Sequence, residues 1–214
     1  MSVTVTREHA EKIVDLLQHG LVSGVGKPVP GKMCVEALVC YALGLPHGDD
    51  PGCVSQPLRR LKIGLNDGAW SSDQARATGL RRLALAQLGS AGVLDDAVFV
   101  AQIVDMTIRR SVPASLRAAA SVNPGHADAL EAAAVRCETK GTRKSALNGE
   151  CVARAAARAA SAARAASAAS AASAASAAAR DKSLAAFAEW VVEILIDMNA
   201  PGCQWLDLVP KQDA

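Results

Sequence analysis

A cysteine at the expected start of a helix is the first residue in the chain that could perform nucleophilic chemistry. Cys34 begins the apolar segment CVEALVCYALG. A helix dipole lowers the pKa of a thiol in its first turn, and His47 or His126 could act as the base, oriented by an acid such as Asp49 or Asp50. A Cys34-dependent hydrolase or transferase is therefore one alternative. A cysteine that packs as a small buried hydrophobe is the commoner role, and the Cys-Gly-Ser-Cys-Trp pattern of papain-like enzymes is absent.

The same residues could in principle bind zinc, because cysteine and histidine are its usual ligands. The candidates would be Cys34, Cys40, His47 and Cys53. No Cys-x-x-Cys pair is present among them, and structural zinc sites usually contain such a pair. We expect no metal site and no cofactor.

The segment GVGKPVPGK, residues 24–32, could approach a phosphate group. Glycines allow a close backbone approach, and Lys27 and Lys32 add positive charge. A Walker loop requires a Ser or Thr after its Gly-Lys, and this segment has neither that hydroxyl nor a clear preceding strand. A Pro/Gly turn between helices is the simpler interpretation.

A loop-lined pocket for a small ligand is the leading site prediction. Loops on a rigid frame commonly carry binding residues, and three loops here contain polar and aromatic groups, at 24–32, 47–53 and 66–70. The predicted ligand-binding residues are Lys32, His47, Asn66, Asp67 and Trp70.

Doubled arginines occur on three separate predicted elements. If the fold gathers them with Lys27 and Lys32, they would bind a phosphorylated ligand, because guanidinium groups grip phosphate in pairs. If they scatter, they are solvated helix ends, which is the interpretation we favour. The pairs are Arg59 with Arg60, Arg81 with Arg82, and Arg109 with Arg110.

The elements that must position these residues centre on an alanine tract. Alanine is the best helix former, so we expect a long Ala-rich helix over about 142–180. The tract is poor in Pro and Gly, which argues against a linker, and its serine row winds around the helix, which argues against a flat ice-binding face. An apolar stripe at helical spacing predicts a C-terminal amphipathic helix over about 182–199.

Earlier helices are indicated by caps and apolar periodicity. Thr6 and Ser71 or Ser72 are expected N-caps, and Thr142 can cap the Ala-rich helix. Gly79 inside a helix indicates a close packing contact. Short extended segments near residues 2–5 and 205–209 could pair as strands between the termini.

Composition constrains the class of protein. Half of the 214 residues are apolar, only six are aromatic, and the formal net charge is +2. The small net charge and the scarcity of aromatic residues therefore argue against nucleic acid as a partner. No run of bulky apolar residues is long enough to span a membrane, the first residues lack the pattern of a secretory signal, and six dispersed cysteines favour a reducing compartment. We expect a cytoplasmic protein.

Several motifs of the chain resemble those of uncharacterised Ala-rich helical proteins found in bacteria and their phages. The motifs are GKMCVEALVCYALGLPHGDDPGCV, LNDGAWSS, RRLALAQLGSAG and APGCQWL. The resemblance covers most of the chain and implies no particular activity. It suggests a setting in phage or defence-related biology, where small helical proteins often act by binding.

Together these observations predict an all-α protein with a single domain over residues 1–214, built around the Ala-rich helix. We expect it to act by binding a small anionic ligand, with a phosphorylated ligand as one candidate, rather than by catalysis. The alternatives are the Cys34-dependent enzyme and a homo-oligomeric assembly protein in which the Ala-rich helix self-associates.

Overall fold

The chain folds into helices joined by loops. The computed structural model describes residues 4–163 and 170–211, with side chains described for 4–157 and 177–211. Within these ranges there is no β-strand, and the sole extended pairing is an isolated bridge between Gly26 and Met33. The prediction of an all-α fold is therefore confirmed.

The helices follow one another along the chain with few long interruptions. In chain order they are α1 (Arg7–Leu17), α2 (Val35–Ala42), α3 (Gln56–Asn66), α4 (Asp73–Ala86), α5 (Asp96–Met106), the π-helix η1 (Thr107–Ser111), α6 (Val112–Ser121), the short 3₁₀ helix η2 (Pro124–His126), α7 (Ala127–Lys140), α8 (Arg143–Ala163), α9 (Ser170–Asp197) and the 3₁₀ helix η4 (Pro201–Leu208).

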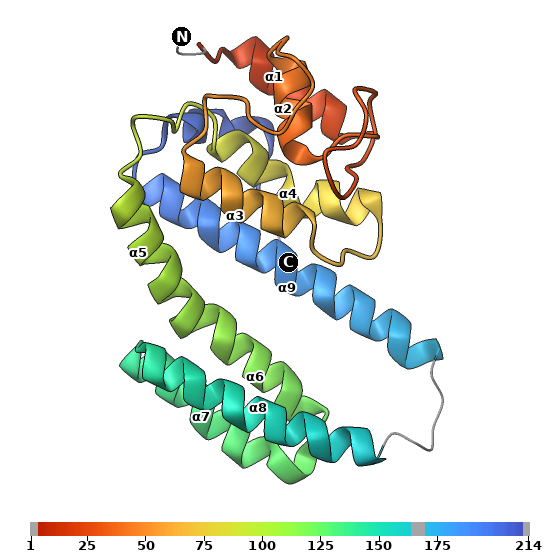
Figure 1. Cartoon of the computed structure of the whole chain (residues 1–214), viewed down its shortest axis with the longest axis vertical. Helices are drawn as coiled ribbons and strands as arrows, with labels where there is room; N and C mark the ends of the chain where they lie inside the picture. Colours follow the sequence, from red (N-terminus) through yellow and green to blue (C-terminus); the bar gives the residue numbers. More distant parts are fainter. Residues whose placement is uncertain (1–3, 164–169, 212–214) are drawn as a thin grey trace. The chain divides into compact units, whose positions relative to one another are not determined.

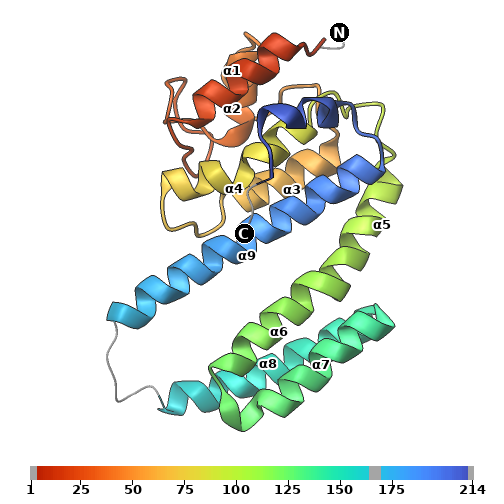
Figure 2. The same cartoon turned by 180° about the vertical axis from the view of Figure 1, so that it is seen from behind.

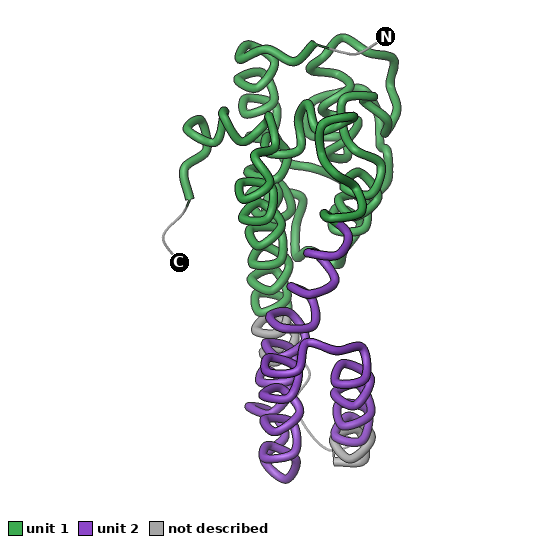
Figure 3. Tube along the Cα trace, turned by 90° about the vertical axis from the view of Figure 1, so that its left-hand side faces the viewer, with its two compact units in different colours: residues 1–99, 172–214 green, residues 100–171 purple. Residues whose placement is uncertain are grey.

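Where the sequence indicated one continuous domain, contacts divide the chain into two compact units. Unit 1 comprises residues 1–99 and 172–214, and unit 2 comprises residues 100–171 (Figure 3). One division falls within α5 and the other within α9. Each unit is described by itself.

Unit 1 is a helical layer in which α1 packs against α2 and α4 (Figure 1). The predicted caps position these helices. The Thr6 hydroxyl accepts a hydrogen bond from the His9 amide, and the Ser72 hydroxyl accepts one from the Ala75 amide at 3.0 Å. Each cap satisfies an amide that the helix itself leaves unpaired.

The C-terminal segment of unit 1 is helical rather than extended. Residues 201–208 form η4, which lies beside α4 (Figure 2), so the predicted strand at 205–209 is not present. Gly202 rests against the backbone of Leu85 and Leu88, where any Cβ would clash, and Trp205 is buried. A 3₁₀ turn makes both contacts possible in a short segment. Residues 2 and 3 of the other predicted strand lie outside the described residues.

The alanine tract contributes to two helices, α8 and α9. Residues 164–169 of the predicted helix lie outside the described residues. α9 continues without a break through Asp181, so the C-terminal amphipathic stripe belongs to the same helix as the last alanines. That stripe buries Val191, Val192 and Leu195 in the core of unit 1.

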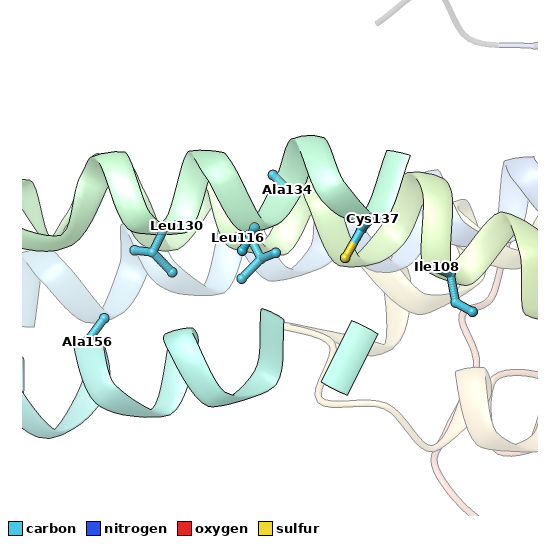
Figure 4. Close-up of a cluster of buried hydrophobic side chains, with 7 residues drawn as sticks. Ile108, Leu116, Leu130, Ala134, Cys137 and Ala156 are labelled. Atoms are coloured by element: carbon cyan, nitrogen blue, oxygen red, sulfur yellow. The ribbon is translucent and has the colours of Figure 1, made fainter. Parts of the chain in front are cut away.

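Unit 2 is built on α6, α7 and α8, which pack against one another. Its core is small and aliphatic: Ile108, Leu116, Leu130, Ala133, Ala134, Cys137 and Ala156. In Figure 4 Leu116, Leu130 and Ala156 point into the space between their helices. α7 ends at Gly141, whose φ of 60° is left-handed, and Thr142 caps α8 as predicted.

Candidate functional site

Two of the predicted ligand-binding residues, Asn66 and Asp67, form hydrogen bonds to neighbouring backbone segments instead of lining a large pocket. The Asn66 side chain is buried; it accepts a hydrogen bond from the Val35 amide at 3.2 Å and donates one to the Val22 carbonyl at 3.0 Å. These bonds join the end of α3 to the start of α2 and to the segment before it. Removing the amide would leave buried backbone groups without partners.

Asp67 holds the neighbouring turn. Its Oδ1 accepts hydrogen bonds from the Gly24 amide at 2.8 Å, from Ser23 at 3.2 Å and from Asn66 at 3.0 Å. Partial burial by itself would raise the pKa of Asp67, but these three bonds stabilise the carboxylate and the net pKa is lowered. Asp67 is therefore a charged anchor of the 22–24 segment.

A small hollow lies between these anchors and the start of α2. Its volume is about 50 Å³, and its lining includes Cys34, Glu36, Asp49, Asn66 and Asp67. Ligand pockets usually enclose about 300–1,000 Å³, whereas one liquid water occupies about 30 Å³. The hollow is large enough for water and too small for the predicted ligand.

The remaining predicted residues lie elsewhere. Lys32 is exposed, and neither it nor His47 lines the hollow. His47 is also exposed, with its Nε2 atom 3.2 Å from the Gly26 carbonyl oxygen. Trp70 is buried and lines a different cavity, described below. Of the five residues, Asn66 and Asp67 line the small hollow and Trp70 lines the other cavity, so neither of these two cavities brings all five together.

Cys34 is the N-cap residue of α2. Its sulfur accepts a hydrogen bond from the Ala37 amide at 3.3 Å, and its side chain is buried. Burial raises the pKa of Cys34, although hydrogen bonds at the helix start partly oppose this. The expected lowering of this pKa is wrong, because desolvation of the thiolate exceeds the effect of the helix terminus.

The structure also bears on the zinc alternative. Among residues 4–163 and 170–211, no group of three or more His, Cys, Asp or Glu side chains is placed to hold a metal ion. Cys40 is buried, and burial raises its pKa to about 12. A thiol held in its protonated form is a poor ligand.

A buried polar centre in unit 1 was missed by the sequence analysis. Lys62 of α3 and Glu36 of α2 are both fully inaccessible, with Lys62 Nζ 3.3 Å from Glu36 Oε1. Gln87, also inaccessible, lies after α4 with its Nε2 atom 3.4 Å from Glu36 Oε2. The available signal was a polar residue inside each of three apolar stretches, VEALV, LKIGL and LAQL.

Burial disfavours the charged forms of both Glu36 and Lys62. Burial raises the pKa of Glu36 and lowers the pKa of Lys62, and in each case the partner's charge offsets only part of the change. Apart from this ion pair, neither Lys62 Nζ nor Glu36 Oε1 has a hydrogen-bond partner within the described part of the chain. Because the contacts of Glu36 join α2 to α3 and to the end of α4, we assign this centre a role in fixing how the three helices pack.

A groove lies between α4 and α9 in unit 1. Its volume is about 680 Å³, within the range of ligand pockets. Trp70 and Trp190 both line it, and the alanines Ala75, Ala185 and Ala186 form much of its apolar surface. The sequence did not identify this site, because α4 and α9 lie about a hundred residues apart in the chain.

Gly79 sets the shape of the groove wall. A Cβ at this position would overlap the ring of Trp70 and would lie 3.3 Å from the Ala185 methyl. The close contact that the sequence predicted at Gly79 is therefore made by Trp70. The indole Nε1 donates to the Leu65 carbonyl at 2.9 Å, so the ring is held from its polar edge and presents carbon to the groove.

Charged side chains border the groove, and most of them are paired. Arg82 binds Glu189 at 3.1 Å, and Lys211 binds Glu193 at 3.2 Å. Asp181 accepts a hydrogen bond from the Ser71 amide at 2.8 Å. Arg81 and Lys182 also line the groove, and neither forms an ion pair with a carboxylate in the residues that the structure describes.

One arginine of each doubled pair binds a carboxylate of its own unit. Arg59 binds Asp49 at 2.6 Å, Arg82 binds Glu189, and Arg109 of unit 2 binds Asp105 at 2.8 Å. Each of the three has its own carboxylate. Only Arg81 and Arg82 belong to the groove.

Comparison with protein families, curated proteins and solved structures found no match to this chain. Within the described part of the chain, no helix is both long and apolar enough to cross a membrane.

Proposed function

We propose that the protein is a non-catalytic binding protein that holds a small ligand in the groove between α4 and α9. The observation that carries the proposal is a groove of about 680 Å³ lined by two tryptophans. In a chain with only six aromatic residues, two at one cavity are a marked local concentration. Indole rings favour a flat apolar or aromatic ligand body.

Charge favours a ligand with an anionic group. Arg82 and Lys211 form ion pairs with glutamates, whereas Arg81 and Lys182 have no carboxylate partner in the described structure. Lys182 lies beside Asp181 near Ser71, and Arg81 lies near Pro210, so cationic groups border two regions of the groove. A sulfonate, carboxylate or phosphate on an aromatic body would match this arrangement.

Phage or defence biology remains the proposed setting, on the resemblance of sequence motifs. Binding of a small anionic molecule is compatible with such a role. The raised pKa of Cys34 and its burial count against the alternative of a cysteine-dependent enzyme.

The test uses 8-anilinonaphthalene-1-sulfonate, an aromatic anion of the proposed class, titrated into the full chain while its fluorescence is followed. We expect saturable binding of one molecule per chain. Ala186→Phe should fill the groove and weaken binding by about tenfold or more, since even modest steric misfit costs above 1 kcal/mol.

The matched control is Ala178→Phe, which adds the same side chain at an exposed position of α9 that does not line the groove. It should bind as the wild type does. Equal binding by both variants would place the probe elsewhere and overturn the proposed site. Lys182→Ala and Arg81→Ala should each weaken binding by roughly two- to tenfold, as expected for loss of one charged contact.

A further inference from the structure

A second groove lies in unit 2, between α6 and α8, and it is independent of the ligand groove. Its volume is about 400 Å³. The two helices pack closely: a Cβ at Gly149 would lie 3.1 Å from a Leu116 methyl. Small residues of α8, Ala146, Gly149 and Ala153, therefore form much of the floor.

A large apolar side chain stands at the edge of this floor. Leu147 lines the groove, and 49% of its surface is exposed. The surface thus carries both a protruding leucine and a shallow apolar depression. A protrusion beside a depression allows one copy of a surface to fit another copy, as two-fold symmetric interfaces require.

Charge order along α8 supports the same geometry. Arg143, Leu147 and Glu150 all line the groove, and their spacing of four and three residues places them on one stripe of the helix. Two α8 helices that cross antiparallel near Leu147 would set Arg143 of each copy opposite Glu150 of the other. Arg143 forms no ion pair with the described carboxylates, and the Glu150 pairing with Arg154 is exposed and therefore weak.

We propose that the groove between α6 and α8 is a self-association surface, and that its occupant is α8 of a second copy of this chain in antiparallel orientation. Leu147 of each copy would enter the depression of the other, and two Arg143–Glu150 pairs would flank the two-fold axis. An unrelated apolar helix would fill the depression but would not supply the opposed charges in this order.

The test measures the mass of the full-length chain by sedimentation equilibrium across a concentration series. The wild type should form dimers. Arg143→Glu alone and Glu150→Arg alone should each weaken dimerisation by about tenfold or more, because each places like charges opposite one another. The double variant Arg143→Glu/Glu150→Arg should restore the opposed charges and recover affinity to within about threefold of the wild type.

Lys144→Glu is the matched control. Lys144 is exposed on the same turn of α8 and does not line the groove, so its reversal changes net charge without touching the surface. It should dimerise normally. A wild type that stays monomeric at about 100 µM, where even weak specific dimers form, would overturn the proposal. Dimers unaffected by the single reversals, or a double variant no better than either single one, would overturn it equally.

Circular dichroism distinguishes loss of the surface from loss of folding. The reversed residues are exposed, so all four variants should keep the wild-type helical signal. Leu147→Ala gives a second readout that does not depend on charge. It should weaken the dimer, and an unchanged dimer would contradict the placement of Leu147 at the axis.

Discussion

In unit 1 the Glu36–Lys62 pair and the ion pairs around the α4–α9 groove differ in their access to solvent. Glu36 and Lys62 are fully inaccessible, and the hollow that Glu36 lines has a volume of about 50 Å³. The pairs around the α4–α9 groove, such as Lys211 with Glu193, are partly exposed beside a volume of about 680 Å³. Both places collect ionisable groups, but only the groove could admit a ligand.

The two kinds of ion pair also differ in what they do for the fold. A partly exposed pair contributes about 0–1 kcal/mol to stability, so it can exchange partners when a ligand arrives. A buried pair cannot be broken without leaving an uncompensated charge. Perturbed pKa values therefore mark the structural centre of this protein, whereas cavity volume and aromatic lining mark the candidate binding site.

The largest expected effect comes from breaking the buried pair. Lys62→Met removes the ammonium group and leaves Glu36 without its counter-ion. Loss of one partner of a buried pair typically costs about 3–5 kcal/mol, and we expect a decrease of this size in the free energy of unfolding. Urea denaturation followed by circular dichroism would measure it.

The double variant Glu36→Leu/Lys62→Met is the control for this substitution. It replaces the pair with apolar side chains of similar volume and should recover most of the lost stability. If the double variant is no more stable than Lys62→Met, the cost arises from packing and not from the unpaired charge.

The Lys62→Met deficit should also depend on pH. Burial raises the pKa of Glu36 above its ordinary value of 4.5, and the Lys62 charge offsets part of this rise, so Lys62→Met should raise the folded-state pKa of Glu36 further than in the wild type. A carboxyl group whose pKa is raised in the folded state stabilises the folded protein most at pH values below its pKa in the unfolded chain. This stabilisation is lost as the pH rises through the folded-state pKa. The variant should therefore approach wild-type stability near pH 4.5 and fall furthest below it at neutral pH. A deficit that stays constant over this window would contradict the account.

A smaller effect is expected at the groove wall. Gly79→Ala places a Cβ on the ring of Trp70 and should lower the free energy of unfolding by about 1–3 kcal/mol, because an overpacked site must shift its neighbours. Tryptophan fluorescence should report the displaced ring.

Gly64→Ala is its matched control, since Gly64 lies in α3 and a Cβ there would meet no atom within 4 Å. That change should stabilise the chain by about 0.5–1 kcal/mol, the helical preference for Ala over Gly. Equal effects at the two glycines would mean that Trp70 does not pack on Gly79.

The smallest perturbation is alkylation of native thiols, which should leave the fold intact. Cys151 is exposed, whereas Cys34 is buried and burial raises its pKa. Iodoacetamide at neutral pH should therefore modify Cys151 at least about tenfold faster than Cys34, as thiolate fraction and access both dictate. Peptide mass spectrometry would measure both rates. Faster reaction at Cys34 would instead support the alternative that the protein is a Cys34-dependent enzyme.

Local features of the sequence predicted much of the fold. Thr6, Ser72 and Thr142 cap helices as expected, because a cap is decided by a side chain and an amide two or three residues away. The contact at Gly79 was also indicated, although its partner Trp70 was not. These predictions concern interactions within one or two helical turns.

Features that depend on distant segments could not be predicted in the same way. The sequence predicts Asn66 and Asp67 as ligand-binding residues, because a polar turn has the same sequence pattern whether its side chains bind a ligand or form hydrogen bonds to the protein's own backbone. The burial of Lys62 could not be predicted, because the sequence does not show that Glu36 lies opposite it. The groove needs α4 and α9 to meet, and the small side chains that form it carry no chemical signature.

The central claim is that the groove between α4 and α9 holds a small molecule, and native mass spectrometry of freshly purified protein tests it most directly. We predict that the wild type and Ala178→Phe retain an added mass on the order of a few hundred daltons per chain, as a drug-sized ligand would give, and that Ala186→Phe does not. Bare chain masses for all three proteins, or the same added mass on Ala186→Phe, would contradict the claim.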